Sequence, residues 1–185
     1  MCHLRGDLII SADAGILSYI EDADERPCRL VLSGSRLDGI VTLSDLQRLP
    51  VRPAIFLLIT HLELLMSDWI REHSQSEQEW LELLKDGRPK EIEKQWKKLQ
   101  VNDLAIDKLT ATHFSDKYKL VVELGTFEDT GRSENELYRI KELRNRVAHA
   151  GDYALTQETA RETIEVVGLA RKWIRLLGAE PDNRA

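Results

Sequence analysis

This sequence has few cysteines, and its net charge is negative. The 185 residues include only Cys2 and Cys28, so one disulfide is the most that could form. Neither a disulfide scaffold nor a cysteine zinc site fits that count, and reduced thiols are the simpler interpretation. The chain carries 26 Lys and Arg against 32 Asp and Glu, a net charge of −6. A uniformly basic surface for nucleic acid is therefore excluded, although local basic patches are not.

Long hydrophobic runs and metal-ligand patterns are missing as well. The most apolar stretch, residues 54–66, contains His61 and Glu63 and is shorter than the roughly 18 apolar residues that a membrane span needs. The first residues lead into only a short apolar pair, unlike a signal peptide. No His-Glu-x-x-His or Cys-x-x-Cys pattern gathers metal ligands. We therefore expect a cytoplasmic protein with no metal site and no membrane partner.

Two regions of the chain differ in their periodicity. Residues 1–52 alternate short apolar runs with turn formers, which predicts a compact α/β unit that is too small to bury a good core alone. Residues 53–185 have helical periodicity, which predicts a bundle and, for the whole chain, an α+β fold. The expected strands lie near residues 8–10, 30–32 and 40–42, with helical stretches near 14–20 and 44–48.

Capping residues divide the second region into helices. Ser76-x-x-Glu79 and Ser133-x-x-Glu136 have the form of capping boxes, and Pro53 suits the first turn of a helix that ends near His73. That helix is apolar on nearly every side in its first half, which predicts burial all round. The remaining expectations are that Gly87 and Pro89 end the helix begun by Ser76, that helices cover 90–100 and 116–124, and that Thr156 caps the last helix.

A basic stretch stands out in this acidic chain. Residues 139–149 hold four cations and one carboxylate, a local charge of +3 that leaves −9 for the remainder of a chain whose net charge is −6. We expect three of these cations, Arg139, Lys141 and Arg146, to bind RNA phosphates. The alternative is an ordinary bundle helix whose arginines are solvated.

Arg144 and His149 form the candidate catalytic pair within this stretch. They are five residues apart, about 140° around a helix, so they meet most easily where two copies of the chain face each other. An imidazole exchanges protons near neutral pH and a guanidinium holds phosphate, which suits phosphodiester cleavage by the neighbouring 2′-hydroxyl. Asn145 shares a helix face with His149. In the alternative interpretation His149 only covers the helix end.

The pattern Arg-x4-His from Arg144 to His149, with a polar Asn145 after the arginine, resembles the HEPN superfamily of helical bundles. The surrounding ELRNRVAHAGDY and the upstream HFSDK (residues 113–117) add to the resemblance, which covers about residues 53–185. It implies a homodimeric, metal-independent endoribonuclease of toxin or antiviral type that leaves 2′,3′-cyclic phosphate ends. Arg144 and His149 would then be catalytic, with Asn145 supporting. Apart from the resemblance, Glu63 interrupts an apolar helix and would either orient the pair, since buried carboxylates rarely go unpaired, or face water.

An antitoxin partner stays open. HEPN toxins silenced by a nucleotidyltransferase antitoxin usually carry tyrosine two residues after the histidine, where this chain has Gly151. The nearest tyrosine is Tyr153, so the resemblance does not extend to that modification.

The segment from Asp38 to Leu46 resembles the closing strand and helix start of a single CBS repeat. The resemblance implies an adenine nucleotide as a regulator, with Thr42 and Asp45 contacting ribose and phosphate, and no required cofactor. The alternative is that Thr42 or Ser44 only caps a helix. One repeat is half of a binding unit, which again predicts a homodimer. The second function left open is a non-catalytic adaptor dimer that senses nucleotide or binds RNA or protein.

Overall fold

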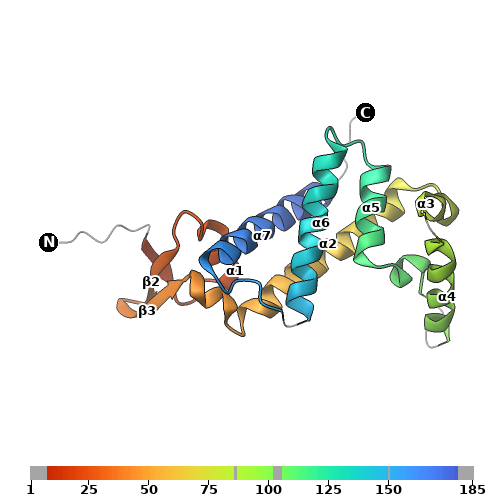
Figure 1. Ribbon diagram of the computed structural model, residues 1–185. Coiled ribbons are helices and arrows are strands. Elements are labelled where there is room, and N and C mark those ends of the chain that lie inside the picture. Colours follow the sequence, from red (N-terminus) through yellow and green to blue (C-terminus); the bar gives the residue numbers. More distant parts are fainter. Residues whose placement is uncertain (1–7, 86, 102–105, 150, 179–185) are drawn as a thin grey trace. The chain divides into compact units, whose positions relative to one another are not determined.

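Helices make up most of the chain, with one three-stranded sheet near its N-terminus (Figure 1). The computed structural model describes residues 8–85, 87–101, 106–149 and 151–178. The predicted α+β class is confirmed. The chain divides into two compact units: unit 1 comprises Met1–Ile59 and Glu142–Lys172, and unit 2 comprises Thr60–Lys141 and Trp173–Ala185. The division of the sequence at residues 52 and 53 stays a prediction about its modules.

The sheet of unit 1 has the strand order β1-β2-β3. β1 (Ile9–Ser11) pairs parallel with β2 (Cys28–Ser33), and β2 pairs antiparallel with β3 (Arg36–Thr42). Parallel strands need a crossover, which α1 (Ile16–Asp22) supplies. Gly34, at φ 60°, turns the chain between β2 and β3, so β3 begins at Arg36, earlier than the strand expected near residues 40–42.

The core of unit 1 consists mainly of apolar residues from helices rather than from the sheet. The 3-10 helix η2 (Leu43–Gln47) leads into α2 (Val51–His73), whose first turns lie in this unit. The end of α6 (Thr130–Ala148) and most of α7 (Gln157–Leu177) complete it. Thr156 and Thr159 exchange hydrogen bonds at the start of α7, which confirms the predicted cap. The buried residues include Tyr19, Ile20, Leu46, Val51, Ile55, Leu143, Val147, Tyr153, Ala160 and Val167.

In its described residues, unit 2 contains three further helices and one 3-10 turn. α3 is Glu77–Leu83, α4 is Arg88–Gln100, η3 is Lys108–Ala111 and α5 is Phe114–Leu124. The prediction that Gly87 and Pro89 end the helix after Ser76 was wrong, because both residues begin α4. Gly87 is its N-cap at φ 76°, and proline is tolerated in the first turn, where its missing N–H has no helical partner.

The start of α6 also differs from the prediction. α6 begins at Thr130, and the Asp129 carboxylate accepts a hydrogen bond from the Arg132 amide at 2.9 Å. The predicted capping box from Ser133 was therefore wrong. Glu136 lies inside the helix, where its carboxylate accepts a hydrogen bond from the Trp173 indole at 3.0 Å. Leu137, Ile140, Leu143 and Val147 follow one another at steps of three or four residues and are all buried, so they form the apolar stripe of α6.

Helix α2 is buried on one face rather than all round. Five of its apolar residues are inaccessible to solvent, whereas Phe56, Leu57 and Leu64 are exposed. By length and hydropathy alone, this 23-residue helix would also be long enough to cross a bilayer, a test that core helices of other proteins pass as well. The five inaccessible residues, spaced three or four apart, are Ile55, Ile59, Leu62, Met66 and Ile70.

Candidate functional site

Arg144 lies near the C-terminal end of α6, in unit 1. Its side chain is half-buried, and its guanidinium carbon lies 6.0 Å from the centre of the Phe56 ring. None of the carboxylates that the structure describes forms an ion pair with it. An arginine whose charge is not neutralised by the protein is available to bind an external phosphate.

His149 lies one residue beyond the last residue of α6. Its amide donates to the Asn145 carbonyl at 3.0 Å, so the helical hydrogen bonding continues to this position. The side chain is exposed, and within the described ranges the imidazole has no hydrogen-bond partner. The ring is therefore free to exchange a proton with a bound molecule.

Arg52, in the first turn of α2, fixes the segment that carries His149. Its guanidinium donates to the Val147 carbonyl at 3.0 Å and to the Gly151 carbonyl at 3.1 Å, two residues before and two after His149. The Val147 carbonyl lies in the last turn of α6, where acceptors lack partners within the helix, and the Gly151 carbonyl lies in the loop that follows. One planar side chain thus ties the last turn of α6 to the following loop. The Gly151 amide also donates back to Arg146 at 2.8 Å.

The loop after α6 is held by the buried Tyr153. Its hydroxyl donates to the Leu46 carbonyl at 2.6 Å, and the Arg52 guanidinium lies 5.1 Å from its ring centre. With its side-chain oxygen turned toward the loop, Gln47 accepts hydrogen bonds from the backbone amides of Leu155 and Ala154 at 2.8 and 3.0 Å. Burial raises the pKa of Tyr153, and the Arg52 cation offsets part of that rise. The segment that carries His149 is therefore interlocked with η2.

Comparisons with protein-family models, with curated proteins and with solved structures found no match. Function is inferred from this chain's own residues.

Two of the three predicted RNA-binding cations of α6, Arg146 and Lys141, have partners within the chain. Arg146 forms an ion pair with Glu162 at 3.2 Å. The Lys141 ammonium lies 4.7 Å from the centre of the Tyr138 ring, and Arg139 is half-buried. The structure places Arg146 in unit 1, together with Arg144, Asn145 and His149, and places Arg139 and Lys141 in unit 2.

Glu63 belongs to an ion pair of unit 2. The Lys117 ammonium lies 2.9 Å from its carboxylate, and both side chains are largely shielded from solvent. The neighbouring Asp116 is buried and accepts two hydrogen bonds from Arg88, at 2.6 and 3.0 Å. Two residues of the HFSDK segment thus neutralise charges of unit 2. Glu63 has a partner of its own, and an orienting role for it stays a prediction.

Thr42 and Asp45 contact each other at the start of η2. The Thr42 amide and hydroxyl donate to one Asp45 oxygen at 2.7 and 3.1 Å, and Arg48 binds the other at 2.6 Å. This is the capping arrangement that the sequence offered as the alternative to nucleotide binding. A nucleotide at these side chains would have to replace those bonds. Among the described residues, no group of His, Cys, Asp and Glu is placed to hold a metal ion.

Sequence reasoning missed Arg52, which lies 95 residues before its partner Val147. No local pattern reveals a contact at that separation. The expectation of a helix over residues 90–100 also did not separate Lys97, which is paired with Glu93, from the other lysines of α4.

Proposed function

We propose that this protein is a metal-independent endoribonuclease of HEPN type that acts as a homodimer. The observation that carries the proposal is the state of the Arg-x4-His pair. Arg144 has no carboxylate partner within the described chain, and the exposed His149 follows a helix end that Arg52 holds in place. The Arg144 guanidinium and the His149 imidazole are therefore both available to an external phosphate.

In the proposed reaction the 2′-oxygen of the RNA attacks the adjacent phosphorus and the bond to the 5′-oxygen breaks. One His149 imidazole takes the proton of the 2′-hydroxyl. The leaving 5′-oxygen needs a proton, which the protonated His149 of a second copy of the chain supplies. Arg144 binds the phosphate and stabilises the charge that develops on its oxygens. The products are a 2′,3′-cyclic phosphate and a 5′-hydroxyl, so the nucleophile comes from the substrate itself.

Regulation by an adenine nucleotide at the CBS-like strands is part of the proposal, as is a role in toxin or antiviral systems. What supports a link is the contact between the two segments within unit 1. Leu46, next to Asp45, accepts the hydrogen bond of Tyr153, four residues after His149. A ligand that displaced the bonds between Thr42 and Asp45 would act on η2 and therefore on Tyr153.

The test is cleavage of a labelled single-stranded RNA in excess EDTA, with identification of the product ends. We expect 2′,3′-cyclic ends from the wild type and at least a 100-fold loss in His149→Ala and Arg144→Ala, since proton transfer alone contributes roughly 100-fold or more. His61→Ala and Arg175→Ala are matched controls, because both side chains are exposed and have no partner in the described chain. Intact RNA with and without adenine nucleotides would instead favour the non-catalytic adaptor dimer.

A further inference from the structure

Three lysines of α4 form a row on one side of the helix. Lys90, Lys94 and Lys98 are four residues apart, so each lies about 6 Å further along the axis and only about 40° around it. All three side chains are exposed, and in the described chain none has an ion-pair or hydrogen-bond partner. We call these three residues the lysine row.

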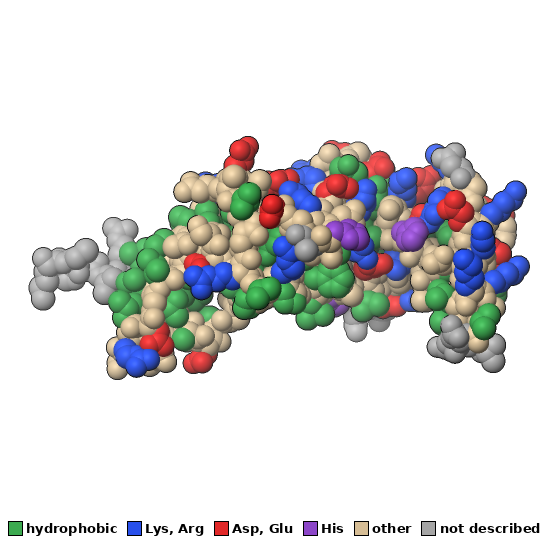
Figure 2. All heavy atoms as spheres, turned by 60° about the horizontal axis from the view of Figure 1, so that its bottom comes forward, with side chains coloured by type: hydrophobic (Ala, Val, Ile, Leu, Met, Phe, Trp, Pro, Cys, Tyr) green, Lys and Arg blue, Asp and Glu red, His purple; other side chains and the backbone are tan. Residues whose placement is uncertain are grey.

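The other cations of α4 are neutralised. Arg88 binds Asp116 at 2.6 Å, and Lys97 binds Glu93 at 3.2 Å. Glu93 is also bound by Lys108 of η3 at 3.0 Å, and hydrogen bonds from Lys108 and Lys97 lower its pKa. The positive charge that remains for an external anion on α4 is therefore the lysine row. Figure 2 shows Lys and Arg side chains gathered at the right-hand edge, where α4 lies.

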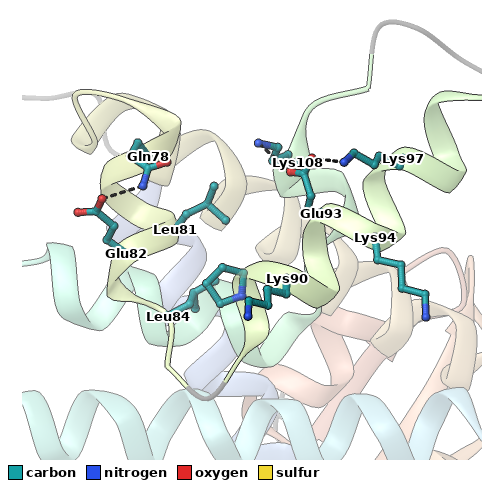
Figure 3. Close-up of a pocket in the computed structure, with 10 residues that line it drawn as sticks. Gln78, Leu81, Glu82, Leu84, Lys90, Glu93, Lys94, Lys97 and Lys108 are labelled. Carbon is teal, nitrogen blue, oxygen red and sulfur yellow. Dashed lines mark hydrogen bonds and ion pairs between the residues drawn. The ribbon is translucent and has the colours of Figure 1, made fainter.

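The lysine row stands between two hollows of unit 2. The larger, of about 640 Å³, lies between α3 and α4 and is open to solvent. Its apolar lining is Leu81, Leu84 and Pro89, and Figure 3 shows Leu81 pointing from α3 toward α4. Lys90 and Lys94 line this hollow, whereas Lys94 and Lys98 line a smaller one of about 210 Å³ on the side of His113.

We propose that the lysine row binds the sugar-phosphate backbone of a single RNA strand and that the larger hollow receives its bases. The three lysine ammonium groups are evenly spaced and flexible, which suits a polymer that carries one phosphate per nucleotide. The apolar side chains of the larger hollow, which Glu82 and Glu93 also line, can cover the face of a base. The choice of RNA rather than an acidic protein rests on the proposed function, whereas the positions of the contacts rest on α4 alone. The lysine row would thus bind substrate through residues other than Arg144 and His149.

The experiment measures the affinity of a labelled oligouridylate for the full chain over a series of salt concentrations. His149→Ala is the background in every sample, so that the RNA is not cleaved. Each lysine that neutralises a phosphate of a single strand contributes about 0.7 to the slope of log K against log salt. The triple variant Lys90→Gln, Lys94→Gln, Lys98→Gln should therefore lose roughly 2 units of slope. Lys119→Gln, an exposed and unpaired lysine of α5, should keep the slope of the background protein.

Failures of the two proposals can be told apart. A triple variant that keeps the full salt slope overturns the lysine row, even if the wild type cleaves RNA. Polyglutamate that displaces the RNA at equal charge, with the same dependence on the three lysines, overturns RNA as the ligand. A lost slope in the triple variant, combined with a wild type that binds RNA without cutting it, supports the lysine row and rejects only the nuclease.

Discussion

Tyr153 provides a test of how firmly η2 holds the loop that follows α6. Its hydroxyl donates to the Leu46 carbonyl at 2.6 Å, and both residues are inaccessible to solvent. Tyr153→Phe keeps the ring against Arg52 and removes only the hydroxyl. The Leu46 carbonyl then stays buried without this donor. The substitution therefore isolates one hydrogen bond between segments 107 residues apart.

The expected loss follows from the burial of the acceptor. A buried group left without its partner costs about 1–3 kcal/mol, and the full burial of both residues favours the middle of that range. We expect a loss of about 2 kcal/mol in the free energy of unfolding of unit 1. For a chain of this size, a loss of 1 kcal/mol lowers Tm by roughly 2–4 °C, so Tm should fall by roughly 4–8 °C.

The hydroxyl should also make the stability depend on alkaline pH. Burial raises the pKa of Tyr153 above the ordinary 10.0, with Arg52 offsetting part of the rise. The folded state therefore holds the phenol proton more tightly than the unfolded state does. The resulting stabilisation is complete below about pH 10 and is lost as the pH rises through the raised pKa. Tyr153→Phe should lack this alkaline loss.

The assay is urea unfolding and a thermal melt, with amide hydrogen exchange of residues 151–156 as a local readout. Tyr138→Phe is the matched control, because Tyr138 is 46% exposed and its hydroxyl makes no hydrogen bond within the described chain. We expect the control to be as stable as the wild type at neutral pH. A Tyr153→Phe variant as stable as the control, with unchanged exchange in the loop, would refute the reasoning.

Two further predictions concern the guanidinium clamp and the shielded ion pair. In Arg52→Lys, the lysine has no planar fork with which to reach both the Val147 and the Gly151 carbonyl. Amide hydrogen exchange at His149 should therefore accelerate, and RNA cleavage should fall mainly through kcat. The control is Arg161→Lys, at an exposed ion pair. Lys117→Met should lower the free energy of unfolding by about 3 kcal/mol, because it leaves the Glu63 carboxylate shielded and unpaired. The double variant Lys117→Met, Glu63→Leu should regain most of this loss. A urea titration measures both variants.

The helices that the sequence predicted best are those with a regular apolar stripe. Leu137, Ile140 and Leu143 are buried because residues three or four apart share one face of α6, and that spacing is visible in the sequence. Helix ends were harder to predict, because several residues compete for the same role. Asp129, rather than Ser133, accepts a hydrogen bond from a backbone amide at the start of α6. Gly87 begins α4 instead of ending α3.

The candidate site shows the same division between local and distant information. Arg144 and His149 are found from their spacing because both belong to one short segment. Arg52 of α2 and Leu46 of η2 hold that segment through contacts that span about a hundred residues. Such contacts depend on how the chain packs, and a single sequence holds no pattern for them. The CBS-like pair was ambiguous for another reason, since Thr42 and Asp45 satisfy each other as a cap.

On α4 and α6, the formal charge of the helix differs from the charge that is available to bind a ligand. The segment 139–149 and α4 have the same formal charge of +3. On α6, Arg146 is paired with Glu162, a residue of another helix that the local count omits. On α4, the pairing of Lys97 with Glu93 follows from their spacing, but the pairing of Arg88 with Asp116 does not. Because a paired cation must give up its partner before it binds a phosphate, the lysine row and Arg144 should contribute more to RNA affinity than Arg146 does.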